Sequence, residues 1–238
     1  MKKILTSAIL ASTLFTVSGV SAYADTTVSD TTTTTLENQV LDKTISEIKD
    51  IIAPEVNVSQ DGIKIEDKQA ILDNLKSVNL DVLEQASREQ GVIGEEDQLT
   101  EEKLLDAFST GIDSLNQSIE SGDLTVLDEG TMVPTNDDNF YLQGGSTYDV
   151  TYWWGKKRYK STYYANKWAS DLNTAANANA GAAVLAGAIF GGVGAIPNGL
   201  TAAYSYQLAN KVSYYNSLSS RGIVANLTWL LVFTVNKQ

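Results

Sequence analysis

Thirty-nine consecutive residues, 172–210, contain no Asp, Glu, Lys or Arg. Within them lies the Gly/Ala-rich run GAAVLAGAIFGGVGAI at 181–196, followed by Pro197-Asn198-Gly199, a sequence typical of a turn. Helix-forming residues lie on both sides of this turn, and the second helix is expected over about 200–219. The uncharged stretch therefore predicts a helical hairpin that packs either in a protein core or in a lipid bilayer.

The length of the Gly/Ala-rich run argues against a permanent membrane span. Sixteen helical residues extend about 24 Å, less than the roughly 30 Å hydrocarbon core of a bilayer. The six strongly apolar residues contribute about −0.3 to −0.6 kcal/mol each to insertion, and the five glycines oppose it. We therefore expect a hairpin that rests in a soluble core, with conditional membrane insertion as its function.

Small residues at every fourth position of the same run would let two helices approach closely. This spacing also occurs in soluble helical hairpins, so it does not by itself identify a membrane protein. The residues expected to pack or to insert are Ala183, Gly187, Gly191, Phe190 and Pro197.

Two segments flank the uncharged stretch and alternate in side-chain character. STYDVTYWW, at 146–154, and GIVANLTWLLVFTVNKQ, at 222–238, are both rich in aromatic and β-branched residues. This pattern predicts two long strands, which would pair to satisfy their backbones. The expected fold class is α+β, with an acidic helical region followed by a C-terminal β-α-α-β unit.

The N-terminus has the features of a secretory signal peptide. Lys2 and Lys3 precede the apolar run 4–20, and Ala22-Tyr23-Ala24 is a cleavage site of the Ala-x-Ala type. We expect cleavage before Asp25, rather than an N-terminal membrane anchor, because the run is rich in Ser and Thr. The chain is therefore expected to be extracellular or cell-surface associated, in a Gram-positive bacterium.

Charge and aromatic residues divide the mature chain. Residues 25–139 contain 27 acidic and 7 basic residues, whereas 140–238 contain 2 acidic and 8 basic residues. All four Trp and ten of the eleven Tyr also lie after residue 140. This division predicts separate units. After the signal peptide 1–24, these are a Thr-rich spacer 25–35, an acidic helical domain or pro-region 36–125, a linker 126–145 and a basic aromatic domain 146–238.

The composition excludes most catalytic and metal sites. The chain has no Cys and no His, so it lacks the thiol nucleophile, the commonest general base and the commonest metal ligand. Carboxylate-only glycosidases remain, but the adjacent Glu95 and Glu96 fit a solvated patch better than an acid pair. We therefore expect no enzyme activity and no cofactor.

One segment imitates a calcium-binding loop. NVSQDGIKIEDK, at 57–68, places Asp61 and Gly62 at plausible EF-hand positions. Its twelfth residue is Lys68, however, where a bidentate carboxylate is needed, and Asp61 is the only carboxylate at a ligand position. A turn with a short strand is the better interpretation, and no metal site is expected.

Cationic and aromatic residues are interleaved around 153–160. Such a mixture favours an anionic surface, either a membrane or a cell-wall polymer, and export argues against a nucleic-acid partner. The alternative is that the aromatic residues form core and the lysines a solvated strand end. The expected docking residues are Trp153, Trp154, Lys156, Lys157, Arg158, Tyr159 and Lys160.

The last 100 or so residues carry a resemblance. YWWGKKRY, the Gly/Ala-rich stretch and RGIVANLTWLLVFTV resemble a group of uncharacterised secreted proteins of Gram-positive bacteria. In character the region is similar to unmodified bacteriocins, although the pediocin-like motif and the disulfide cysteines are absent, and in composition alone to colicin pore domains.

These observations lead to two functional hypotheses. The first is a secreted, non-enzymatic protein whose C-terminal domain is membrane-active and self-associates, masked by its acidic region. The second is a soluble extracellular or cell-envelope binding module that does not insert.

Overall fold

The structure is a computed structural model that describes residues 27–127, 130–135, 141–142, 145–178, 181–191 and 199–238. The predicted signal peptide and Pro197 therefore lie outside the described residues. Residues 36–238 form one compact unit, and the described residues before it, 27–35, belong to a second. The fold class is α+β, as the sequence predicts.

Six antiparallel strands form the main sheet, in the order β10-β9-β8-β7-β4-β3. Two small hairpins lie outside it. The strands of the main sheet are β3 (Leu124–Val126), β4 (Met132–Pro134), β7 (Tyr148–Tyr152), β8 (Gly155–Lys160), β9 (Ile223–Thr228) and β10 (Phe233–Lys237). The hairpins are β1 (Val56–Ser59) with β2 (Gly62–Ile65), and β5 (Tyr141–Leu142) with β6 (Gly145–Ser146).

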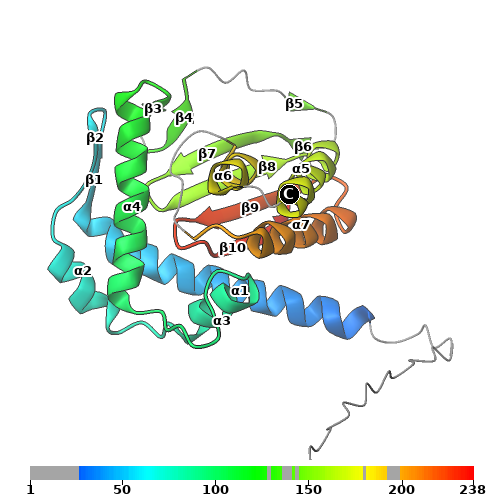
Figure 1. Cartoon of the computed structure of the whole chain (residues 1–238), viewed down its shortest axis with the longest axis horizontal. Helices are drawn as coiled ribbons and strands as arrows, with labels where there is room; N and C mark the ends of the chain where they lie inside the picture. The colour runs from blue at the N-terminus through cyan, green and yellow to red at the C-terminus, as the bar shows by residue number, and fades with distance from the viewer. Residues whose placement is uncertain (1–26, 128–129, 136–140, 143–144, 179–180, 192–198) are drawn as a thin grey trace, which may run out of the picture. The chain divides into compact units, whose positions relative to one another are not determined.

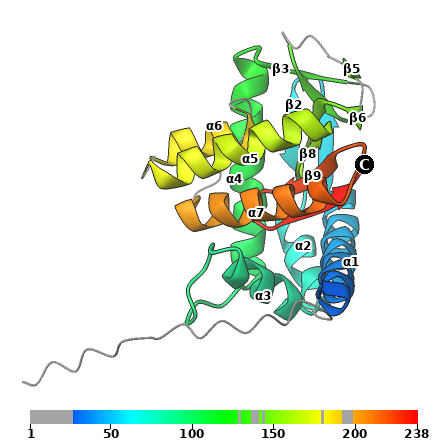
Figure 2. The ribbon, with the colours of Figure 1, turned by 90° about the vertical axis from the view of Figure 1, so that its right-hand side faces the viewer.

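Helices cover both faces of the sheet in the unit 36–238, with α5, α6 and α7 on one face and α1 on the other (Figures 1 and 2). The helices before the sheet are α1 (Thr27–Ile52), the short 3-10 helix Ala53–Glu55, α2 (Lys68–Leu75), α3 (Asp81–Glu89) and α4 (Glu101–Glu120). The helices between β8 and β9 are α5 (Thr162–Asn177), α6 (Ala182–Phe190) and α7 (Ala202–Ser217).

Side-chain caps begin three of these helices. The side chains of Asp67, Thr100 and Thr201 each accept a hydrogen bond from a backbone N–H in the first turn of α2, α4 and α7. In contrast, α1 begins at Thr27, within the segment 25–35 that the sequence predicts to be a Thr-rich spacer. Extending a helix that has already formed costs less than starting one, which accounts for the difference.

The predicted strand 222–238 is a hairpin of β9 and β10, and the predicted strand 146–154 is β7 followed by the turn into β8. Trp153 and Trp154 form the turn between β7 and β8, and 229–232 form the turn between β9 and β10, where Leu231 has a φ of 60°. A side chain on Gly155 would place its Cβ 2.1 Å from the Leu227 carbonyl oxygen, so only glycine fits there. Alternation continues through tight turns like these, so the period of the sequence does not reveal them.

The helical hairpin also differs from the prediction, because three helices lie between the strands. α5 and α7 pack together, and the Ser205 hydroxyl donates to the Leu172 carbonyl oxygen at 2.9 Å. At the other end of the pair, the Asn216 amide donates to the Thr162 carbonyl oxygen at 3.0 Å. The Gly/Ala-rich run supplies α6, a separate nine-residue helix.

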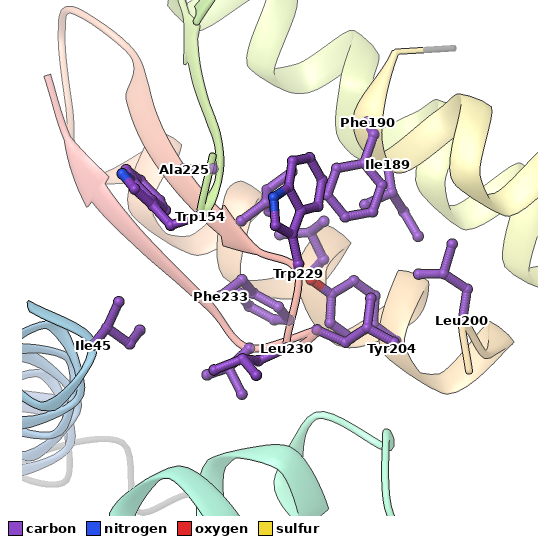
Figure 3. Packing of buried hydrophobic residues seen from close by; sticks show 14 of the residues in the cluster. Ile45, Trp154, Ile189, Phe190, Leu200, Tyr204, Ala225, Trp229, Leu230 and Phe233 are labelled. Carbon is purple, nitrogen blue, oxygen red and sulfur yellow. The ribbon is translucent and has the colours of Figure 1, made fainter. Parts of the chain in front are cut away.

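One core joins the acidic and the basic portions of the chain. Gly111 of α4 lies directly against Trp229, since a Cβ at Gly111 would stand 2.4 Å from the indole ring. Figure 3 shows Trp229 close to Phe190, and the two ring centroids are 5.6 Å apart. Composition predicts separate units divided at 126–145, whereas the contacts place 36–238 in one unit. Charge composition reflects mainly the surface, whereas most of the buried residues of both portions are apolar.

Candidate functional site

The alternation of β8 divides the predicted docking residues between the two faces of the sheet. Lys156 and Arg158 point toward α6, where they bond its carbonyl oxygens. Lys157 lies on the opposite face, near the rings of Tyr152 and Trp154. The sequence KKRYK is therefore a central strand, and it does not present all its cations on one surface.

The face toward α6 holds that helix by its C-terminal end. The Lys156 ammonium donates to the Phe190 carbonyl oxygen at 2.6 Å, and the Arg158 guanidinium donates to the carbonyl oxygens of Ala188 and Ile189. The Trp168 indole N–H also donates to Ala188, at 2.8 Å. Cations suit this position because the unpaired carbonyls make a helix C-terminus partially negative. We call Lys156, Arg158 and Trp168 the α6 clamp.

Asp149 of β7 holds the clamp in place. Its carboxylate accepts from Arg158 Nε at 3.1 Å and from Lys160 Nζ at 2.8 Å. Burial by itself would raise the pKa of Asp149, but Arg158, Lys160 and Lys156 outweigh burial and lower this pKa below its ordinary value. Lys156 and Arg158 are only 2% and 7% exposed, so they are part of the interior in this conformation.

The opposite face carries a second group of lysines and rings, which we call the lysine–aromatic face: Lys49, Lys157, Tyr152 and Trp154. The Lys49 ammonium lies 4.4 Å from the centroid of the Trp154 ring, and that of Lys157 lies 6.0 Å from the same centroid. Tyr152 stacks on Trp154 with centroids 4.9 Å apart. Both lysines and Tyr152 are partly exposed, and Trp154 is buried beneath them.

The two lysines influence each other electrostatically. Burial lowers the pKa of Lys49, and the nearby positive charge of Lys157 lowers it further. Asp50 and Asp42 act in the opposite direction, but neither forms an ion pair with Lys49 among those of the described residues. Asp42 instead accepts hydrogen bonds from Thr234 and the two asparagines of β9 and β10. An anion bound between Lys49 and Lys157 would relieve their repulsion.

The remaining predicted docking residues are Tyr159, which lies on the same side of β8 as Lys157, and Trp153 of the turn. Tyr159 stacks on Tyr148 with centroids 4.3 Å apart, and both rings are partly exposed. Trp153 packs against Phe108 of α4, and its carbonyl oxygen accepts from the Trp229 indole at 2.7 Å. Trp153 therefore belongs mainly to the core.

Two of the residues predicted to pack helices closely, Ala183 and Gly187, do not do so in the described structure. Ala183 is exposed, and apart from α6 itself no atom of the described residues lies within 4 Å of the position where a Cβ of Gly187 would be. Gly191 ends α6 in the left-handed conformation, with a φ of 83°. Phe190 is buried, as the hypothesis of a packed hairpin requires.

The sequence pattern does not predict the roles of two important residues of these faces, Asp149 and Lys49. Asp149 is the only acidic residue between 140 and 170, and its isolation in a basic segment was a signal of a buried partner. Lys49 gave no signal, because its partner, Trp154, lies more than one hundred residues away in the chain. Only the tertiary structure brings these two together.

The described residues contain neither a candidate metal site nor a candidate membrane-spanning helix. The segment that imitates an EF-hand forms the β1–β2 hairpin. Among all the described residues, no group of three His, Cys, Asp or Glu residues is placed to bind a metal ion. No helix within the described ranges has both the length and the apolar character needed to cross a membrane.

Comparison with known proteins gives no further guide. The chain matches no protein-family model, no curated protein and no solved structure. Its function must therefore be inferred from the two faces of this sheet.

Proposed function

We propose that this is a secreted, non-enzymatic protein that binds anionic polymers of a bacterial envelope through its lysine–aromatic face. The observation that carries the proposal is the convergence of Lys49 and Lys157 on the Trp154 ring, with no ion pair to either among the described residues. Two neighbouring ammonium groups on a partly exposed surface favour an anionic ligand.

The chemistry of the face suits a polymer of phosphodiester-linked sugars or polyols. Lysine ammonium groups bind phosphate as point charges, and the C–H faces of a polyol stack on aromatic rings such as the partly exposed Tyr148–Tyr159 pair. The whole chain has a net charge of −12, which opposes binding to an anionic polymer. Binding therefore has to come from a local positive site.

The experiment is co-sedimentation of the purified chain with Gram-positive cell walls, before and after chemical removal of their anionic polymers. The double variant Lys49→Gln/Lys157→Gln should bind the intact walls about 30-fold more weakly, since each cation contributes about 1 kcal/mol near an anionic surface. Lys43→Gln/Lys157→Gln is the matched control for charge, because Lys43 is an exposed residue of α1. It should lose only about fivefold.

Added salt should weaken binding by the unmodified chain. Equal binding to intact and stripped walls would contradict the proposal, and so would equal loss in the double variant and its control.

A second candidate is membrane activity by α6, favoured by the exposure of its apolar N-terminal half. Val184 is 59% exposed, and the surface beside Gly187 is open. Release of α6 from its clamp would then precede contact with an anionic membrane. Leakage of dye from anionic vesicles should be stronger for Asp149→Asn, which loosens the clamp, than for the unmodified chain. Absence of leakage with both proteins at every pH tested would eliminate this candidate.

A further inference from the structure

Side-chain amides close the outer edges of three strands. The Asn116 amide makes a reciprocal pair with the backbone N–H and C=O of Ile63 in β2, at 2.7 and 2.9 Å. Gln238 does the same at Ser146 of β6, at 3.0 and 2.9 Å. Gln90, at the end of α3, pairs with Phe233 of β10, at 2.9 and 3.0 Å. A primary amide has an oxygen that accepts and an NH2 group that donates. It can therefore make the same two hydrogen bonds as the backbone of a residue in a neighbouring strand.

The edge at β10 is the most extensive of these, because β10 is the last strand of the main sheet. The Thr228 N–H donates to the Val232 carbonyl oxygen, and the Gln238 N–H donates to the Gly222 carbonyl oxygen. These two bonds show that the even-numbered residues of β10 direct their backbone groups toward β9. Phe233, Val235 and Lys237 therefore direct their backbone groups away from β9. Gln90 occupies both groups of Phe233, and the Asn38 amide donates to the Val235 carbonyl oxygen at 2.9 Å.

β10 has little protection of its own against pairing with another strand. Its sequence, FTVNK, contains no Pro, and its one charged residue, Lys237, is the last. Proteins usually protect such an edge with prolines, charges, bulges or a covering segment. Here the cover comes from the acidic portion of the chain, and it leaves Phe233 and Val235 only 2% and 1% exposed. Asn38 of α1 and Gln90 at the end of α3 are the side chains that bond the outward backbone groups of β10.

We propose that β10 is a latent pairing strand for a second copy of this chain, kept closed by Gln90 and Asn38. A second β10, running antiparallel about a two-fold axis at Val235, presents the same outward groups at the same spacing. Phe233 of each copy then lies opposite Lys237 of the other, and the interface is isologous. This inference is independent of polymer binding, since β10 contributes no lysine or ring to the lysine–aromatic face.

The test removes the two amides. The full chain carrying Gln90→Ala/Asn38→Ala should form a dimer whose population rises with concentration, measured by size-exclusion chromatography with light scattering. The matched control is Gln85→Ala/Gln39→Ala, which removes two exposed amides from α3 and α1. The proposal is overturned if the folded variant has the same mass as its control at every concentration.

A third substitution separates strand pairing from nonspecific aggregation. Adding Lys237→Pro removes an outward N–H from β10 and should restore the monomer, whereas Lys237→Ala should not. A dimer that persists with Lys237→Pro overturns the assignment to β10.

If circular dichroism shows that the alanine pair does not fold, the single variants Gln90→Ala and Asn38→Ala decide the question. Each frees part of the outward edge of β10, so each should raise the dimer population above that of the unmodified chain. Two folded single variants that stay monomeric at every concentration would overturn the proposal.

Discussion

At the scale of single residues, glycines mark the positions where close packing is required and where it is not. Gly111 of α4 allows Trp229 to lie against the helix backbone, and a Cβ there would be 2.4 Å from the ring. Gly187 of α6 belongs to the small-residue repeat that is conspicuous in the sequence, but it faces open space. Close packing therefore depends on Gly111, the single glycine of α4, and not on the glycines of the small-residue repeat in α6.

Alanine substitutions at these two glycines should have opposite effects on stability. Gly111→Ala should lower the free energy of unfolding by about 1–3 kcal/mol, because the added methyl group overpacks the core against Trp229. Gly187→Ala should raise it by about 0.5–1 kcal/mol, because alanine loses less backbone entropy in a helix. Urea unfolding of both variants measures these changes. Destabilisation by Gly187→Ala would show that the repeat is packed after all.

At the scale of secondary-structure elements, the charged strand β8 is stable in the middle of the sheet because each buried cation has an oxygen partner. Lys156 and Arg158 bond the end of α6, and Asp149 links Arg158 to Lys160. Removing one member of such a buried network leaves the others unpaired, which is costly. The position of α6 therefore depends on Asp149 indirectly. Among the described residues Asp149 forms no hydrogen bond with α6, but it holds Arg158, which does.

Asp149→Asn should lower the free energy of unfolding by about 3–5 kcal/mol and speed amide exchange in α6. Because the folded state depresses the pKa of Asp149, its stabilisation is present above the ordinary value of 3.8 and is lost as the pH falls below it. The variant should lack this acid-dependent component. Unfolding measured from pH 7 to pH 2, with the exposed Asp171→Asn as control, checks both points. Parallel pH profiles for the variant and the unmodified chain would contradict the assigned role.

The elements also show what a sequence can and cannot predict. The helix expected over about 200–219 is found as α7, Ala202–Ser217, whose bounds lie close to the prediction. The turns at Trp153-Trp154 and 229–232 were missed, because aromatic residues rarely mark turns and the alternation continues through them. The docking residues were identified as one surface, whereas strand alternation sends Lys156 and Lys157 to opposite faces. Which face a residue occupies follows from pairing partners distant in the sequence.

At the scale of the whole molecule, the acidic and basic portions of 36–238 share a core. Trp229 lies against α4, Lys49 lies over Trp154, and Gln90 pairs with Phe233. An acidic pro-region that masks or escorts the basic portion remains our proposal for processing. Cleavage within 126–145 should, on this structure, leave two pieces that stay associated.

Residues 140–238 produced alone should not show a cooperative unfolding transition, because Trp153, Trp229 and the β10 edge would lose their partners. Mixing with residues 25–135 should restore a single transition, measured by near-ultraviolet circular dichroism during heating. A sharp transition for 140–238 alone would show that the basic portion is an independent domain.

The most direct test of the polymer-binding site is the pKa of the Lys49 ammonium, measured by NMR with and without a glycerol-phosphate oligomer. In the free protein the pKa of Lys49 lies below its ordinary value of 10.5, because the side chain is partly buried and the charge of Lys157 is close. A phosphodiester bound between the two lysines should raise this pKa toward its ordinary value. In Lys157→Gln the pKa should be higher from the start and respond less to the oligomer. A Lys49 pKa that does not change with saturating oligomer would contradict the site.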